Sequence, residues 1–306
     1  MGYPIRYEKE DEIFFITSRT SEARLWFINC PQFEYMVKAY LAKYAEMFGV
    51  ILYAFTLMGN HYHLLASFPR LNKAKFMQAF NSIVARLAQT HISGFSGRLW
   101  GRRYADQAVV GEDAIENWFF YIALNPVTSG IVKSVSDYKH YNSFFDSVRC
   151  RHKKYKLLNR SAYYEAKRSN KETFREEFIE EYTLQFERLP GYEELDDDEY
   201  QKVLTERLFE RQEEAIIERR NKGQGFASKK YLARIKIGDK PSFSKVSTRY
   251  SLRPLVLTLC RERRQKFLDF YFTLRQQFFE ASKKYLLGDI SVSFPAGTYA
   301  PHMLRI

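Results

Sequence analysis

The strongest constraint on the fold of this chain is a pair of apolar runs separated by a two-residue turn. Residues 50–58 (VILYAFTLM) and 61–68 (HYHLLASF) are rich in β-branched and aromatic side chains, which favour extended strands. The dipeptide Gly59-Asn60 between the runs is typical of a tight turn. The sequence therefore predicts a β-hairpin over residues 50–68.

Periodic segments on both sides of this hairpin indicate the rest of the fold. Composition predicts strands, and apolar residues three and four positions apart predict helices. The predicted strands are residues 13–19 and 104–110, and the predicted helices are residues 31–48, 72–90 with Asn72 as cap, and 112–124. This order of elements predicts an α+β fold in which helices pack on an antiparallel sheet.

After about residue 150 the sequence changes to charged and aromatic segments. Helical spacing predicts helices over residues 172–188, 196–221 and 255–285. We therefore divide the chain into three parts. They are a domain of residues 1–150, a charged helical connector of residues 151–222, and a mainly helical basic region of residues 223–306.

The positive charge is concentrated in the last of these regions. The net charge of the chain is +12, and residues 223–306 contribute 16 Lys and Arg against 5 Asp and Glu. Aromatic residues such as Tyr231 and Phe267 are interleaved with the cations. This pattern suits a surface that neutralises phosphates and stacks on bases. A basic domain that only aids solubility is the alternative.

Several classes of protein are disfavoured by the same sequence. The longest apolar stretch, residues 50–58, is far shorter than the roughly 20 residues of a membrane span. The three cysteines form no CxxC pair, and neither a P-loop nor a dinucleotide fingerprint is present. We expect an unexported cytoplasmic protein with no membrane segment and no nucleotide cofactor.

The second run of the hairpin opens with His61-Tyr62-His63. Alternation along a strand places His61 and His63 on one face and Tyr62 on the other. Two neutral imidazoles so placed can hold one divalent cation. The alternative to metal binding is that both histidines serve only as core or surface residues of the strand.

The predicted helix over residues 112–124 adds a second group of polar side chains. Tyr121 and Asn125 are four positions apart, so they share a helix face. Pro126 disfavours helix at the preceding residue, which places Asn125 at or near the helix end, with its side-chain oxygen free to reach outward. Tyr121 could instead belong to an apolar stripe and Asn125 could be a cap. Together with the histidines, however, these residues supply the parts of metal-assisted phosphoryl transfer.

Three motifs make the first 140 residues resemble a known family. They are LMGNHYHLLA at residues 57–66, RLWGRRYADQAVV at residues 98–110 and YIALNPVTSGIV at residues 121–132. The chain resembles the single-tyrosine HUH transposases, and among them the REP-associated tyrosine transposases. FPAGTYAP at residues 294–301 resembles the end of the longer branch, which has a C-terminal extension.

The resemblance implies a fold and a set of site residues. The HUH endonuclease fold has a ferredoxin-like antiparallel sheet, in which residues 13–19 would be the central strand. His61, His63 and Asn125 would bind Mg²⁺ or Mn²⁺, and Tyr121 would be the nucleophile. A basic residue that several relatives carry after the NPV element is replaced by Thr128, which puts a phosphate contact in doubt.

The resemblance also implies an activity and a set of partners. Members cleave single-stranded DNA beside imperfect REP hairpins, form a 5′-phosphotyrosine, leave a free 3′-OH and thereby catalyse transposition, a form of DNA recombination. Such a protein would work in the bacterial cytoplasm and associate with the nucleoid when bound to DNA. Two alternatives stay open: a domesticated, non-catalytic hairpin-binding regulator, and a hydrolase whose histidines activate water. The sequence also leaves open whether the active form is a monomer or a dimer.

Arg102 and Arg103, beside Trp100, are the candidate DNA-binding residues outside the basic region. Paired guanidinium groups can clamp the backbone near a scissile phosphate. A solvated turn is the alternative for the same residues.

Overall fold

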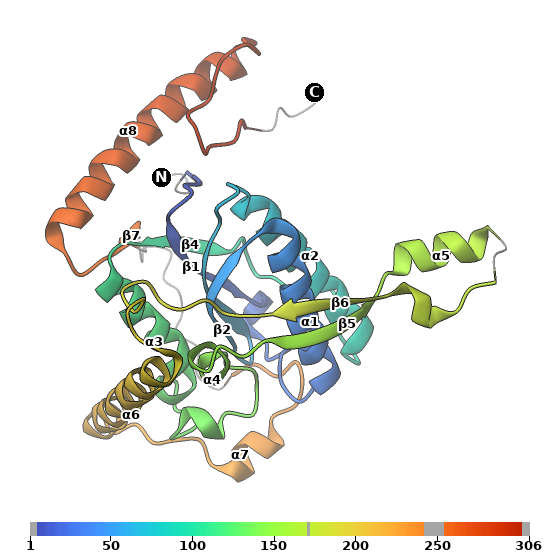
Figure 1. Ribbon diagram of the computed structural model, residues 1–306, viewed down its shortest axis with the longest axis vertical. Helices are drawn as coiled ribbons and strands as arrows, with labels where there is room; N and C mark the ends of the chain where they lie inside the picture. The colour runs from blue at the N-terminus through green and yellow to red at the C-terminus, as the bar shows by residue number, and fades with distance from the viewer. Residues whose placement is uncertain (1–4, 170–171, 242–253, 302–306) are drawn as a thin grey trace.

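The computed structural model describes residues 5–169, 172–241 and 254–301. Its centre is a five-stranded sheet in the order β2-β3-β1-β4-β7 (Figure 1). The strands are β1 (Ile13–Arg19), β2 (Ile51–Leu57), β3 (His61–Ser67), β4 (Ala105–Val109) and β7 (Val256–Leu257). Strands β1 to β4 pair antiparallel with one another, and β7 pairs parallel with β4. The α+β class with an antiparallel sheet is confirmed, with β1 in the centre.

The predicted hairpin is formed by β2 and β3. Leu57 is opposite Tyr62 in the register, and the Met58 amide donates to the His61 carbonyl oxygen at 2.8 Å. Gly59 and Asn60 make the turn. The hairpin turn therefore fixes His61 as the first residue of β3 and His63 as the third.

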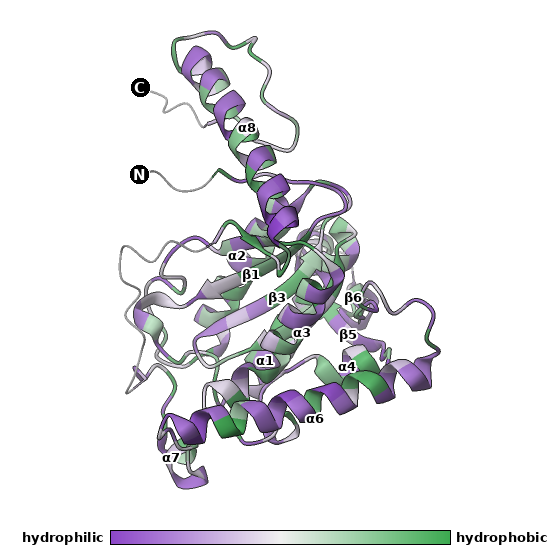
Figure 2. Cartoon of the chain, turned by 90° about the vertical axis from the view of Figure 1, so that its left-hand side faces the viewer, coloured by the Kyte–Doolittle hydropathy of each residue, from purple (hydrophilic) through white to green (hydrophobic). Residues whose placement is uncertain are grey.

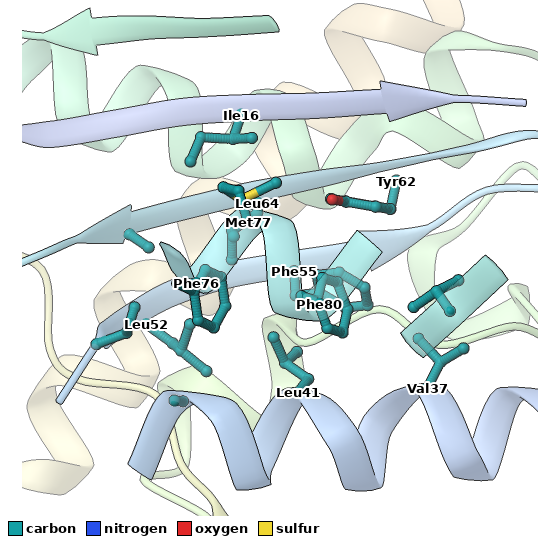
Figure 3. Packing of buried hydrophobic residues seen from close by; sticks show 14 of the residues in the cluster. Ile16, Val37, Leu41, Leu52, Phe55, Tyr62, Leu64, Phe76, Met77 and Phe80 are labelled. Carbon is teal, nitrogen blue, oxygen red and sulfur yellow. The ribbon is translucent and has the colours of Figure 1, made fainter. Parts of the chain in front are cut away.

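Helices α1 (Pro31–Phe48) and α2 (Lys73–His91) cover one face of the sheet (Figures 1 and 3). Figure 3 shows Phe55, Tyr62 and Leu64 of the sheet packed against Leu41 of α1 and Phe80 of α2. Tyr62 is 1% exposed, so its side chain is fixed on this face. Because successive strand residues alternate, its two neighbours must face the other side of the sheet.

The opposite face is covered by α3 (Glu112–Thr128) and α4 (Phe144–Val148), and α6 (Asp197–Asn221) packs on these two helices. Phe119 and Ile122 of α3 belong to the same buried cluster as Phe15 of β1. Helix α6 crosses the outer side of α3 (Figure 2) and buries Tyr200 and Leu204 there. The helix predicted over residues 196–221 is confirmed, and Asp196 caps it.

Helix α3 corrects one prediction. It does not end at the predicted residue 124 but continues through Pro126 to Thr128, so that Asn125 lies in its last turn. Proline has no N–H to donate to the carbonyl of Ile122, four residues earlier. The hydroxyl of Thr56 on β2 donates to that carbonyl instead, at 3.1 Å, and the helix continues.

The connector corrects a second prediction. Residues 172–188 do not form a helix, because residues 175–178 form the short helix η3 and the next residues form strand β6 (Ile179–Leu184). Strand β6 pairs antiparallel with β5 (Lys153–Leu158). The connector is therefore helical only in part, in α5 (Arg160–Arg168) and α6.

The C-terminal region contains α7 (Lys229–Arg234) and the long helix α8 (Arg261–Leu286), which extends away from the sheet (Figures 1 and 2). The helix predicted from residue 255 starts later, because residues 256–257 join the sheet as β7. Part of the predicted basic region, residues 242–253 and 302–306, lies outside the described residues. The remaining short helices are η1 (Ser21–Ala23) and η2 (Val135–Asp137).

Residues 294–301 (FPAGTYAP) fold back onto the N-terminal segment. The Glu8 amide donates to the Gly297 carbonyl oxygen at 2.9 Å, and the Tyr299 hydroxyl donates to a Glu8 carboxylate oxygen at 2.8 Å. Gly297 has φ 73°, and a Cβ atom there would lie 2.1 Å from the Glu8 carbonyl oxygen. Only glycine fits this close approach.

Candidate active site

The two histidines of β3 lie together on the sheet face that α3 covers. Their ring centres are 4.7 Å apart, and the His63 ring stacks on Phe15 with centres 5.2 Å apart. His63 is 6% exposed and His61 is half-buried. The predicted placement of both imidazoles on one face is confirmed.

Asn60 holds His61 in a defined orientation. The Asn60 amide nitrogen donates to the Ala23 carbonyl oxygen at 2.8 Å, so its amide oxygen faces the other way. That oxygen lies 2.6 Å from Nδ1 of His61. An oxygen acceptor at this position places the ring proton on Nδ1 and leaves the lone pair on Nε2. Asn60, predicted only as a turn residue, thus also orients the His61 ring.

Burial also determines the charge of His61. Desolvation and then the positive charge of Arg19 lower the pKa of His61 to about 4. The ring is therefore neutral at pH 7, as a metal ligand must be. Both effects, the fixed tautomer and the neutral ring, make the Nε2 atom available.

Asn125 meets the histidine pair from α3. Its amide nitrogen lies 3.3 Å from Nε2 of His63, and Asn125 is 6% exposed. Rotation about the Cβ–Cγ bond exchanges the amide nitrogen and oxygen, which are distinguished only by their hydrogen-bond partners. Two imidazoles and an amide oxygen form a donor set that fits a divalent cation.

Tyr121 lies one helical turn before Asn125 and is 43% exposed. Its ring centre is 5.7 Å from that of His63, 5.7 Å from that of Phe15 and 4.7 Å from that of Trp118. The ring is therefore packed on three sides, while the side chain remains accessible from solvent. This arrangement suits a nucleophile that must meet a large substrate.

The two predicted DNA-binding arginines occupy different surroundings. Arg102 and Arg103 are both exposed, next to Gly101, whose amide donates to the Arg19 carbonyl oxygen at 3.0 Å. The charge of Arg102 acts on Arg19, whereas that of Arg103 acts on Arg6. The structure therefore brings Arg102 toward the end of β1 beside the histidines, and Arg103 toward the N-terminal segment.

Helix α6 holds α3 at both ends. Glu116 forms ion pairs with Arg207 and Arg211, the second with a distance of 3.0 Å between Nη2 and Oε1. At the other end, Nη1 of Arg219 donates to the Thr128 carbonyl oxygen at 2.7 Å. Tyr121 and Asn125 lie between these two attachments, so α6 fixes the helix that carries them.

The profile of the family "Transposase IS200 like" matches residues 21–125. This segment, about a third of the chain, is similar to that family. The match includes His61, His63, Tyr121 and Asn125, and the general activity of the family is to cut and rejoin DNA. Arg19 lies just before the matched segment.

Two solved structures resemble parts of the chain. The structure of the REP-associated tyrosine transposase bound to a REP hairpin is 20% identical, with a TM-score of 0.38, and the match covers 49% of this chain and 87% of that chain. A Deinococcus radiodurans R1 protein described as a transposase is 18% identical, with a TM-score of 0.28 and coverage of 39% and 90%. No curated protein sequence matches the chain.

Among the described residues, no helix combines the length and hydrophobicity needed to cross a bilayer.

Proposed function

We propose that this chain cuts and rejoins one strand of DNA beside a hairpin, with Tyr121 as the nucleophile. The observation that carries the proposal is the convergence of an accessible tyrosine with three nitrogen and oxygen donors on one face of the sheet. His63 is the centre of this group, 3.3 Å from the Asn125 amide and with its ring centre 5.7 Å from that of Tyr121. The three sequence motifs support the choice of hairpin-flanked single strands as substrate.

The cofactor that fits the donor set is Mg²⁺ or Mn²⁺. His61, His63 and Asn125 would hold the cation, which when bound would stabilise negative charge on the scissile phosphate. In the part of the chain that the structure describes, no three His, Cys, Asp or Glu residues are grouped so that they could hold a metal ion. Negative charge would therefore come from the DNA, which favours a cation bound together with substrate over a tightly held zinc ion.

Tyr121 supplies the covalent step. Its hydroxyl oxygen forms a bond to phosphorus, the bond from phosphorus to the 3′-oxygen breaks, and the phenol proton is transferred to solvent while the 3′-oxygen gains one. The products are a 5′-phosphotyrosine and a free 3′-OH. One phosphoester replaces another, so a 3′-OH can reverse the step on a second strand without ATP. This reversibility allows the same side chain to cut and to join.

A covalent-capture experiment tests the proposal. The protein is incubated with Mn²⁺ and labelled single strands from the DNA that flanks its own gene, and products are separated in SDS. We expect a labelled band at the mass of the protein plus the product strand on the 3′ side of the cut, because the 5′-phosphate of that strand is the one bound to Tyr121. EDTA should remove the band.

The other outcomes identify the competing functions. Cut DNA without attached protein would identify water as the nucleophile and the chain as a hydrolase. Hairpin binding without any cleavage would identify a non-catalytic regulator. Either result would contradict the tyrosine mechanism.

We further propose that α8 contacts the phosphates of the hairpin stem. One stripe of the helix, including Phe267, Tyr271 and Leu274, is buried against the rest of the chain. All seven of its basic residues are exposed: Arg261, Arg263, Arg264, Lys266, Arg275, Lys283 and Lys284. The start of α8 adjoins α3, because Arg263 lies 3.4 Å from Asp113 in an ion pair. Eight residues of α3, about 12 Å, separate Asp113 from Tyr121, so a stem on α8 could place its flanking strand near the tyrosine.

Removal of charge from α8 should reduce the salt dependence of hairpin binding. A variant with Arg264, Arg275 and Lys283 replaced by Gln loses three cations that are exposed. For duplex DNA, the slope of log K against log salt should become less steep by about 0.9 for each lost phosphate contact. Hairpin affinity would be measured over a salt series by fluorescence anisotropy.

A matched control removes the same charge from α5. Arg160, Lys167 and Arg168 are also exposed on a helix, and their replacement by Gln should leave the slope unchanged. Equal slopes for the α8 variant, the α5 variant and the unmodified protein would exclude α8 as the stem-binding element. Truncation after residue 150 is unsuitable as a test, because Tyr200 and Leu204 of α6 belong to the core.

A further inference from the structure

Arg19, the last residue of β1, lies beside the histidine pair. Arg19 is directly opposite His61 in the register of β1 and β3, and Thr17 is directly opposite His63. Side chains of directly opposite residues point to the same face of an antiparallel pair. The guanidinium of Arg19 therefore shares the face on which the two imidazoles and Tyr121 lie.

Among the residues that the structure describes, no carboxylate pairs with Arg19, and a neighbouring charge is positive. The side chain is half-buried, and its Nε atom is buried without a hydrogen bond to any residue that the structure describes. Across the described ranges no Asp or Glu forms an ion pair with Arg19, although Arg24, five residues on, pairs with Glu22 at 3.2 Å. The neighbouring charge is instead that of Arg102.

Backbone contacts keep Arg19 and Arg102 close. The Gly101 amide donates to the Arg19 carbonyl oxygen at 3.0 Å, and Thr20 forms an antiparallel bridge with Trp100. The segment that carries Arg102 is thereby attached to the end of β1. Two cations held side by side repel each other, and an anion between them removes that cost.

We propose that Arg19, together with Arg102, binds a backbone phosphate of the DNA strand that Tyr121 attacks. Guanidinium groups match the geometry of phosphate oxygens and bind them through charge-assisted hydrogen bonds. The register fixes this phosphate site next to His61, so the bound phosphate lies at or beside the scissile position. The inference rests on the proposed function, because it names the part of the substrate that the same site binds.

The position of Arg19 also affects the divalent cation. Without DNA, the charge of Arg19 next to His61 opposes a second cation on that histidine. When DNA is bound, a phosphate between Arg19 and the divalent cation is attracted by both positive charges. Arg19 thereby makes the binding of cation and of DNA mutually dependent, and a residue with a purely structural role would not have this effect.

The test uses binding, so that it does not depend on cleavage. Arg19→Gln and Arg19→Lys are prepared in the full chain with Tyr121→Phe, and affinity for a short linear single strand is measured in Mn²⁺ over a salt series. We expect Arg19→Gln to bind about tenfold more weakly, and its salt slope to be less steep by about 0.7, the value for one single-strand phosphate contact. Arg19→Lys should retain most of the slope, because the charge is kept.

A second measurement separates phosphate binding from damage to the site. Mn²⁺ affinity without DNA is measured by electron paramagnetic resonance, and we expect Arg19→Gln to bind Mn²⁺ at least as tightly as the protein with Arg19. Arg160→Gln removes a charge from an exposed position on α5 and should change neither affinity. Loss of Mn²⁺ affinity together with DNA affinity would assign Arg19 a structural role and overturn the proposal.

The outcomes for the inference and for the proposed function are distinct. An unchanged DNA affinity and slope in Arg19→Gln would overturn the phosphate site even if the protein with Tyr121 forms its adduct. Absence of the adduct would contradict the proposed function, while a weaker, less salt-dependent Arg19→Gln variant would still establish the phosphate site.

Discussion

Replacement of Tyr121 by Phe should abolish the covalent protein–DNA product while leaving DNA affinity unchanged. The substitution removes only the hydroxyl oxygen and keeps the ring, whose contacts with Phe15, Trp118 and His63 fix its position. The loss of the nucleophile should reduce adduct formation on the order of a thousandfold or more. SDS gels with labelled DNA measure the adduct, and anisotropy measures the affinity.

Tyr164→Phe is the matched control for this prediction. Tyr164 is 55% exposed on α5, so its replacement tests the removal of an accessible phenol away from the site. Full adduct formation is expected from this variant. An adduct formed by Tyr121→Phe at the normal rate would falsify the assignment of the nucleophile, and DNA cut by that variant without an adduct would indicate water instead.

Replacement of His61 by Ala should abolish cleavage and leave hairpin affinity within about twofold of its normal value. His61 is half-buried, so the loss of its ring should be compatible with folding, whereas His63 is 6% exposed and stacks on Phe15. A missing imidazole removes one of three donors, and cleavage should decrease by at least about a hundredfold. Rates would be measured at several Mn²⁺ concentrations.

Asn60→Ala should have a smaller effect on cleavage than His61→Ala. It keeps every proposed ligand but removes the oxygen that lies 2.6 Å from Nδ1 of His61. Loss of such a partner typically costs about 10- to 100-fold in metal affinity, so high Mn²⁺ should restore cleavage. His152→Ala, at an exposed position, is the control and should behave normally. Full cleavage by His61→Ala in trace metal would exclude His61 as a ligand.

The central elements could be predicted from the sequence because each carries its own local signal. The helix over residues 31–48 and the strand over residues 13–19 have the bounds that the structure shows. The turn at residues 59–60 determines which strand positions follow it. Once that register is known, alternation alone predicts that His61 and His63 share a face. The family resemblance then added the roles that local pattern cannot give.

Elements that depend on distant contacts were predicted less well. Pro126 indicated a helix end because proline has no N–H to donate to the Ile122 carbonyl oxygen. The Thr56 hydroxyl, on β2 and 66 positions from Ile122, donates to that oxygen instead. Residues 172–188 combine helical spacing with alternation at residues 180–186, and pairing with β5 decides between them. The Lys43–Glu180 ion pair of 3.2 Å then attaches β6 to α1.

The candidate site shows the same limit. Tyr121 and Asn125 are one turn apart on any helix, so their proximity was predictable. The role of Asn60 was not, because it depends on the Ala23 carbonyl oxygen, 37 positions away. The role of Arg19 was equally hidden, since it follows from the alignment of two strands. Polar residues are common at the ends of strands. The sequence alone does not show which of them lie next to a functional group, because their neighbours come from other parts of the chain.

The attachment of α6 to α3 has a consequence for how strands can be exchanged. Glu116 at one end and Thr128 at the other tie the tyrosine helix to Arg207, Arg211 and Arg219 of the same chain. A swing of α3 alone would break these contacts and expose the buried side of α6. If Tyr121 is the nucleophile, as we propose, the phosphotyrosine would stay where it forms, and the incoming 3′-OH would have to travel to it. The moving part of the joining reaction would then be the nucleic acid.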